Sequence, residues 1–338
     1  MDINEAKEKL DHVISISRVE MYKPIQVAEV LVNARKSKGI DLSRVETYRV
    51  PSRQWRDAVT LELFNKRSTS SARFQDDLWN ESAVPPAAMT ALGKVNSTSK
   101  IVEAYIYHFV AEKNRDLAAA RTTLSKLRTA SELKHVLEAF ASSELTSSAD
   151  RLFEILATAV FKCELNQSGY TIQVDRTRGS SLTTSADSLV DLVSRKPVPL
   201  QVGRLGHTNA ADGGLDIWTN FGVVVSVKRR TLTKSLLEQI LQDTIIGELH
   251  IVCLDIEPAA NTVLKKLKTQ GRGITVTLTA DLLNSVQNLL ATPKTRTDLL
   301  SDLIHSFDKE FPMAQTLSHF LETRGYTDIP LSGIWRTR

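Results

Sequence analysis

The segment from Asn209 to Arg230 carries the side chains best suited to chemistry. Asp216 follows a pair of glycines, and an apolar run then ends in Ser226, Val227 and Lys228. Side chains alternate across a strand, so Ser226 and Lys228 are expected on one face, which Asp216 can reach across a hairpin. A carboxylate is a hard oxygen ligand that suits magnesium, and a neighbouring ammonium can orient a water molecule and stabilise charge on a phosphate. The pattern therefore indicates a metal-dependent phosphodiesterase site.

The alternative is an ordinary ion pair between neighbouring strands, which is common for an aspartate and a lysine. Two observations favour the metal site. The valine run 223–225 indicates that the strand lies in the core. A lysine followed by two arginines is unusual at the end of a buried strand, which favours a functional role for them. The glycines before Asp216 also allow a ligand to approach the backbone closely.

Other carboxylates could complete the site. Glu154 lies among apolar residues of a predicted helix, where a charge is costly unless it is paired or bound to a metal. A salt bridge to a neighbouring arginine or lysine explains Glu154 equally well. Glu238 and Asp243, on the helix after Lys228, could supply a displaced acid because Ser226 stands where a carboxylate would help to bind the metal; a solvated helix face is the simpler interpretation of both.

The elements that must position these residues differ between the two halves of the chain. Residues 1–145 form a mostly helical region, with helices predicted over 4–16, from Pro24 to about Gly39, after Pro85–Pro86, and over 100–113 and 131–143. Short strand-like pieces are predicted within 47–73, most clearly at 59–64. Residues 146–338 alternate between predicted helices over 151–163, 236–246, 258–267 and 281–290 and predicted strands over 170–174, 215–218, 223–228, 249–254 and 273–278. This order predicts an α/β fold with a mixed central sheet flanked by helices.

Composition narrows the class of protein. The 338 residues are 42% hydrophobic and 24% charged, which is typical of a globular protein. No apolar run approaches the ~18 residues of a membrane span, and the charged start does not resemble a signal peptide. Cys163 and Cys253 lie in apolar surroundings and are expected to be buried, reduced thiols of a cytoplasmic protein. The net charge of +4 is small, so any nucleic-acid binding must come from local basic clusters.

Four separated segments resemble the HaeII-type type II restriction endonucleases. They are Ser-Arg-Gln-Trp-Arg-Asp at 52–57, Ser-Thr-Ser-Ser-Ala-Arg-Phe-Gln-Asp-Asp-Leu at 68–78, Thr-Asn-Ala-Ala-Asp-Gly-Gly-Leu-Asp-Ile-Trp at 208–218 and Val-Ser-Val-Lys at 225–228. The resemblance runs from Met1 to at least Cys253. It implies that residues 146–338 are a PD-(D/E)XK nuclease domain and that residues 1–145 contribute DNA recognition and dimer contacts.

Within that motif, Asp216 matches the metal-binding aspartate, Lys228 the lysine, and Glu154 the helix carboxylate beside the metal. Ser226 departs from the pattern, because glutamine or a carboxylate is expected there and serine binds metal only weakly or through water. Arg229 stands where histidine is expected. The catalytic set implied by the resemblance is therefore Asp216, Glu154, Lys228 and the position of Ser226.

The resemblance also implies a reaction and its partners. The reaction is Mg2+-dependent cleavage of both strands of double-stranded DNA at a short GC-rich palindrome of the form RGCGCY. A two-fold symmetric DNA site favours a homodimer, and a cognate DNA methyltransferase is the expected genetic partner. Seven polar residues are candidates for DNA contacts, since their side chains can donate to base edges or phosphates: Arg53, Arg56, Arg73, Gln75, Asn209, Arg229 and Arg230.

Two other functions remain open from the sequence. Ser226 would suit a protein that binds specific DNA on a nuclease scaffold without cutting it. A structural α/β protein with an incidental ion pair in a hairpin is the third hypothesis. A neighbouring methyltransferase gene would favour the nuclease.

Overall fold

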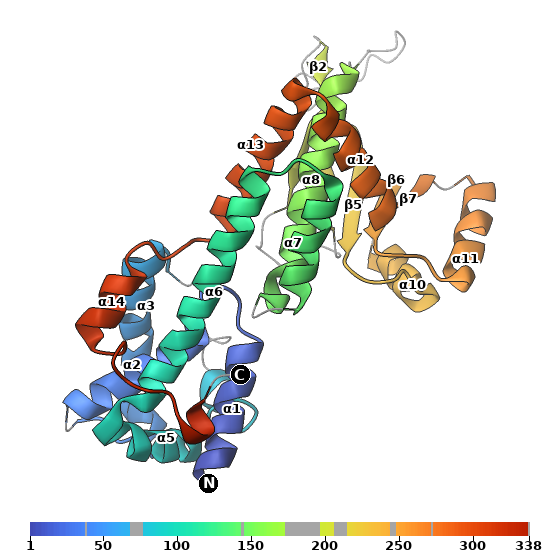
Figure 1. Ribbon diagram of the computed structural model, residues 1–338. Helices are drawn as coiled ribbons and strands as arrows, with labels where there is room; N and C mark the ends of the chain where they lie inside the picture. Colours follow the sequence, from blue (N-terminus) through green and yellow to red (C-terminus); the bar gives the residue numbers. More distant parts are fainter. Residues whose placement is uncertain are drawn as a thin grey trace, which may run out of the picture. The chain divides into compact units, whose positions relative to one another are not determined.

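The computed structural model describes residues 1–37, 39–67, 77–142, 145–172, 197–205, 215–243, 248–271 and 273–336. The chain forms two compact units (Figure 1). Unit 1 comprises Met1–Thr123, Glu138–Ala149 and Asp308–Arg338, and unit 2 comprises Leu124–Leu137 and Asp150–Phe307.

Unit 1 is helical in its described part. Its elements include α1 (Ile3–Ser15), α2 (Tyr22–Lys36), η1 (Val45–Thr47), α3 (Pro51–Phe64), η2 (Asp77–Trp79), α5 (Pro86–Ser99), α6 (Ile101–Ser125), η3 (Thr146–Ser148), α14 (Leu317–Arg324) and η4 (Gly333–Trp335). The start of α1 shows why a helix forms there: the Asp2 side chain accepts from the N–H groups of Asn4 and Glu5, and Glu5 closes a capping box. The predicted helices at 4–16, after Pro24 and after Pro85 are confirmed.

The strand-like reading of residues 59–64 is wrong, since α3 covers them. Pro51 occupies the first turn, where its missing N–H costs nothing. The buried positions Ser52, Arg56, Val59, Leu63 recur three or four residues apart, which is the helical period. The six residues 59–64 contain β-branched and aromatic side chains that are typical of a strand, and the helical period becomes visible only over the whole of α3.

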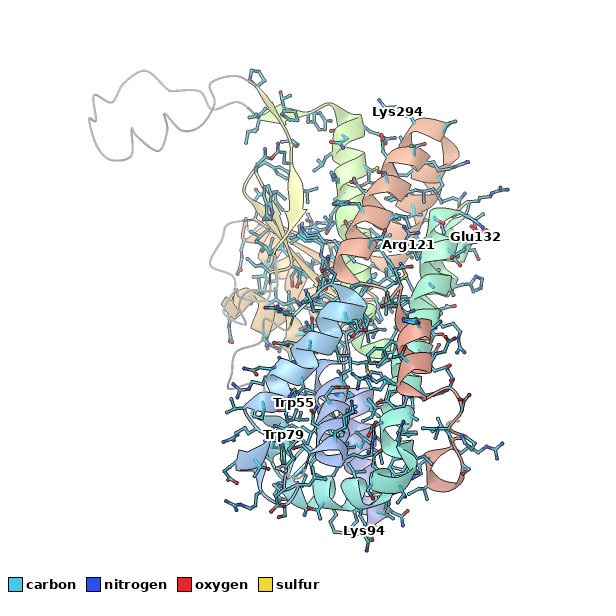
Figure 2. The ribbon with its side chains drawn as sticks, turned by 90° about the vertical axis from the view of Figure 1, so that its left-hand side faces the viewer. Trp55, Trp79, Lys94, Arg121, Glu132 and Lys294 are labelled. Atoms are coloured by element: carbon cyan, nitrogen blue, oxygen red, sulfur yellow. The ribbon has the colours of Figure 1, made fainter. Side chains whose placement is uncertain are left out.

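Aromatic side chains fill much of the core of unit 1. Trp79 is buried and packs edge-on against the Tyr48 ring at 5.0 Å, and Trp55 packs at the margin of the same core (Figure 2). The C-terminal segment completes this core with Leu317, Phe320 and Tyr326. Residues 308–338 therefore belong to unit 1, whereas the sequence placed them with the second domain.

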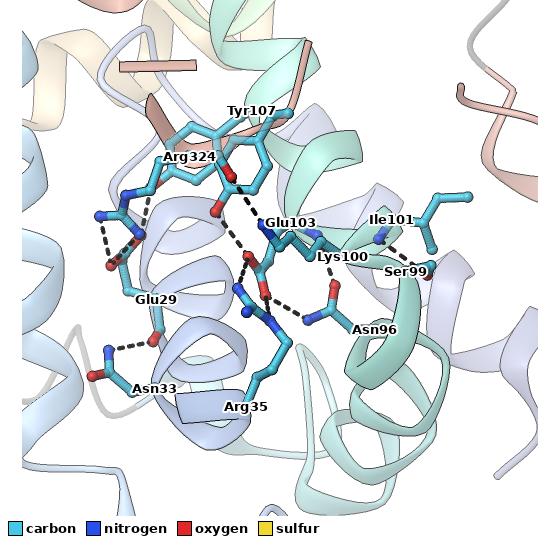
Figure 3. Close-up of polar contacts among 11 residues, drawn as sticks. Glu29, Asn33, Arg35, Asn96, Ser99, Lys100, Ile101, Glu103, Tyr107 and Arg324 are labelled. Carbon is cyan, nitrogen blue, oxygen red and sulfur yellow. Dashed lines mark hydrogen bonds and ion pairs between the residues drawn. The ribbon is translucent and has the colours of Figure 1, made fainter. Parts of the chain in front are cut away.

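A buried polar network also joins the C-terminal segment to α2 and α6 (Figure 3). Arg324 pairs with Glu29 at 3.2 Å, and Glu29 accepts from the Tyr107 hydroxyl at 2.8 Å. Glu103, which has no exposed surface, accepts from Arg35, Asn96 and Tyr326. Each buried carboxylate thus has several donors, as burial of a charge requires.

Unit 2 is built on a five-stranded mixed sheet in the order β3-β4-β5-β6-β7. Its strands are β3 (Val202–Arg204), β4 (Ile217–Thr219), β5 (Val223–Lys228), β6 (Glu248–Cys253) and β7 (Gly273–Leu278). β3, β4 and β5 pair antiparallel, whereas β5, β6 and β7 pair parallel. A separate two-stranded pair joins β1 (Thr171–Ile172) to β2 (Val198–Pro199).

Helices cover both faces of the sheet. α10 (Lys234–Asp243) and α11 (Pro258–Thr269) connect the parallel strands and share a core with Leu249, Ile251 and Cys253. On the opposite face, Phe161 of α8 (Ala149–Ser168) packs edge-on against His250 at 5.3 Å. The remaining helices that reach unit 2 are α7 (Ala130–Ser142), α12 (Thr279–Ala291) and α13 (Pro293–Glu310). The predicted α/β fold with a mixed sheet flanked by helices and a helical N-terminal region is confirmed.

Two further sequence expectations meet the structure here. Cys163 and Cys253 are both buried and free, and burial raises the pKa of each thiol to about 11. Among the described helices, none combines the length and the apolar character that a membrane span requires.

The network in unit 1 leads to a stability prediction. Glu103→Gln removes the charge that Arg35 pairs with in a buried site, so the free energy of unfolding should fall by about 3 kcal/mol. Chemical denaturation measures this change. Glu81→Gln, at an exposed position, is the control and should shift the value by less than ~0.5 kcal/mol. Equal stability of the Glu103→Gln variant and the wild type would contradict the role given to the network.

Candidate active site

Asp216 is held by a β-bulge between β4 and β5. Ile217 is the ladder partner of Val225, and the N–H of Asp216 also donates to the Val225 carbonyl at 2.9 Å. Two consecutive residues therefore lie opposite one, an arrangement that bends the strand and re-aims its side chains. The Asp216 carbonyl accepts from the N–H of Leu205 at 2.9 Å, so the acid is fixed from both neighbouring strands.

The bulge brings the Asp216 carboxylate to the end of β5. Its Oδ2 accepts from the N–H of Val227 at 2.7 Å and lies 2.9 Å from the Lys228 ammonium. Both side chains of the ion pair are largely buried, with 14% and 21% of their surface exposed. The structure therefore brings together the acid and the lysine that the sequence singled out.

Glu154 lies on α8 within electrostatic reach of this pair. Burial raises the pKa of the Glu154 carboxyl, and the negative charge of Asp216 adds to the rise, while Arg151 opposes it. A carboxylate whose charge is disfavoured by burial and by a neighbouring acid is one that a cation would stabilise. Glu154 thus lies near the Asp216–Lys228 pair, and its role as a metal ligand stays a prediction.

Two arginines contact Glu154, which is the salt bridge that the sequence left open as the alternative; only Arg204 was not anticipated. Arg151 Nη1 donates to Glu154 Oε2 at 2.6 Å from one turn earlier in α8, and Arg204 Nη2 of β3 lies 3.6 Å from the same oxygen. The spacing of Arg151 and Glu154 was a usable signal, since residues three apart meet on a helix. Arg204 had no such signal, because β3 is short and contains a glycine.

Ser226, Glu238 and Asp243 are the other site residues proposed from the sequence. Ser226 has no exposed surface and is in register with Ile251, part of the core shared with α10 and α11. This burial favours packing over metal binding for Ser226. Glu238 is exposed on α10 and pairs with Lys234 at 3.8 Å. Asp243 ends α10, and its side chain is outside the described part.

The candidate DNA-contact residues are either buried, half-buried or exposed, or outside the described part of the chain. Arg56 is 2% exposed, pairs with Asp57 at 2.6 Å and donates to Gln26, which favours a structural role. Arg53 is half-buried on α3. Of the two arginines after Lys228, Arg229 bonds Asp150 at 2.8 Å and Arg230 is exposed. Arg73, Gln75 and Asn209 lie outside the described residues.

The donor set at this site fits magnesium better than a softer ion. Within the described residues, no three histidine, cysteine, aspartate or glutamate side chains gather as a metal cage. Magnesium usually keeps several water ligands and is bound by one or two carboxylates together with substrate phosphates. Asp216 and Glu154 supply two such carboxylates, and Lys228 lies beside Asp216.

Comparison with known proteins gives this geometry its context. The HaeII restriction endonuclease family model matches residues 6–326. The type II restriction enzyme HaeII of Haemophilus aegyptius is 31% identical over 96% of this chain and 97% of its own length. The type II restriction enzyme NgoBI of Neisseria gonorrhoeae is 30% identical over 98% of this chain and 93% of its own length. The chain therefore belongs to the HaeII restriction endonuclease family.

Proposed function

We propose that this restriction endonuclease cuts both strands of a short GC-rich palindrome, of the form RGCGCY, in a magnesium-dependent reaction centred on Asp216, Glu154 and Lys228. The observation that carries the proposal is the bulge that fixes the Asp216 carboxylate 2.9 Å from Lys228. An acid and a lysine held at the inner strands β4 and β5 of a mixed sheet, with a helix carboxylate beside them, agree with a PD-(D/E)XK nuclease core.

Each residue has a distinct part in the reaction. Asp216 and Glu154 would hold the cation, which supplies Lewis-acid polarisation of the phosphate and a water of lowered pKa. Lys228 would orient the attacking water and stabilise the charge that develops on the phosphate. Water attacks phosphorus in line and the P–O3′ bond breaks, which leaves a 5′-phosphate and a 3′-hydroxyl.

The proposal extends to partners. A palindrome presents the same phosphodiester on each strand, so a homodimer with one site per strand suits the substrate. Arg53, Arg229 and Arg230, which have exposed or half-buried side chains, remain candidates for DNA contacts. A cognate methyltransferase that protects the host DNA is the expected genetic partner, and the cytoplasm is the compartment where both would act.

One prediction of this proposal concerns Asp216 and Lys228. Asp216→Asn and Lys228→Ala should each lower the single-turnover cleavage rate on the order of 10³-fold, because charge stabilisation at the phosphate is lost, while specific DNA binding persists. Cleavage kinetics and a gel shift on one oligonucleotide duplex measure both quantities.

Lys162 and Asp302 provide a matched control within unit 2. Their Nζ–Oδ1 distance is 2.6 Å, so they form a comparable ion pair on α8 and α13. Asp302→Asn and Lys162→Ala should cut at the wild-type rate. Full cleavage by Asp216→Asn or Lys228→Ala would remove these residues from the active site.

The second prediction concerns the metal. Purified protein should cut unmethylated plasmid DNA into discrete fragments with magnesium, and a chelator should abolish cutting. Glu154→Gln should raise the half-saturating magnesium concentration at least tenfold, because one of two carboxylate ligands loses its charge. Cutting that persists in excess chelator, or an unchanged magnesium requirement in Glu154→Gln, would contradict the metal assignment.

A further inference from the structure

Among the described residues, three cationic side chains contact the two carboxylates of the proposed active site. Lys228 contacts Asp216, whereas Arg151 and Arg204 both contact Glu154 Oε2. These five described side chains together therefore carry a net positive charge before any metal binds. Such a surplus attracts an anion, and the anion of this reaction is the phosphodiester.

Arg204 is anchored to the same bulge as Asp216. In the ladder it lies opposite Ile217, the second residue of the bulge, and the next residue, Leu205, donates its N–H to the Asp216 carbonyl at 2.9 Å. The backbone of Arg204 thus cannot shift without moving the catalytic acid. A side chain mounted on this strand is held in a defined place relative to Asp216.

The contact between Arg204 and Glu154 is the looser of the two arginine contacts. Arg151 makes a hydrogen bond at 2.6 Å within one helix, which is a local pair that the α8 backbone maintains. Arg204 Nη2 stands 3.6 Å from the same oxygen, beyond hydrogen-bond distance, and 18% of its side chain is exposed. Both arginines approach the same oxygen of Glu154, and the Arg204 contact is the longer one. A cation that binds this carboxylate therefore competes with Arg204 before it competes with Arg151.

The planar guanidinium of arginine suits a phosphodiester. It presents parallel N–H donors that match two non-bridging phosphate oxygens, and its charge persists at every relevant pH. We propose that Arg204 is a substrate-binding residue that donates to the non-bridging oxygens of the scissile phosphate once a divalent cation has taken Glu154. This inference rests on the magnesium-dependent cleavage proposed above.

Two measurements separate this role from a merely structural one. Arg204→Ala should lower the single-turnover rate at saturating magnesium by 10²- to 10³-fold, as the loss of one donor to a developing oxyanion does. The affinity of the DNA-free protein for Mn2+, followed by the electron paramagnetic resonance of the free ion, should stay the same or rise severalfold, because a competing cation has left Glu154. Arg204→Lys keeps the charge without the paired donors and should recover part of the rate.

The outcomes are exclusive. A lower rate with equal or tighter Mn2+ binding supports the proposal. A lower rate with weaker Mn2+ binding means that Arg204 only positions Glu154, and an unchanged rate means that it does not touch the reaction; either result overturns the proposal. If Arg204→Ala fails to fold, Arg204→Gln and Arg204→Lys carry the same comparison. A wild-type protein that cuts no DNA would instead overturn the proposed function itself.

Discussion

The carboxylate of Asp216 is the group on which the proposed active site depends. It replaces a backbone carbonyl as the acceptor of the Val227 N–H, and the backbone of the same residue is bonded to both β3 and β5. A bulge is what makes this possible, because a regular ladder would leave the side chain without access to the β5 backbone. The sheet therefore fixes the acid through several hydrogen bonds, and Lys228 and Arg204 are placed relative to it by the same strands.

Charge balance is the second constraint on this site. Glu154 lies in a position that burial makes unfavourable for a charge, and the nearby Asp216 makes it more so. The arginines offset part of that cost in the protein without metal. In the proposed reaction such a site would bind a divalent cation and an anionic substrate together, because the cation offsets the carboxylates and the phosphate offsets the cationic side chains. In unit 1 the buried carboxylates of Glu29 and Glu103 accept hydrogen bonds from donors of the same unit.

The sequence predicted the α/β core and the pairing of Asp216 with Lys228 because these depend on local patterns: period-two alternation, a turn and a lysine at the end of an apolar run. It could not predict the bulge, which depends on which residues of two strands lie opposite each other. It grouped residues 308–338 with the second half, whereas they pack in unit 1, because the docking of Phe320 and Tyr326 on distant helices leaves no local signal. Arg204 escaped notice for the same reason, since its partner is on another element.

The most direct test of this account is to locate the metal. Fe2+ substituted for magnesium generates hydroxyl radicals in the presence of ascorbate and peroxide, and these cut the polypeptide beside the ion. Mass spectrometry of the fragments should show cuts next to both Asp216 and Glu154, which are far apart in the sequence and converge only in the fold. Cuts confined to other segments, or equal cutting in the Asp216→Asn variant, would contradict the assignment of the metal to these two carboxylates.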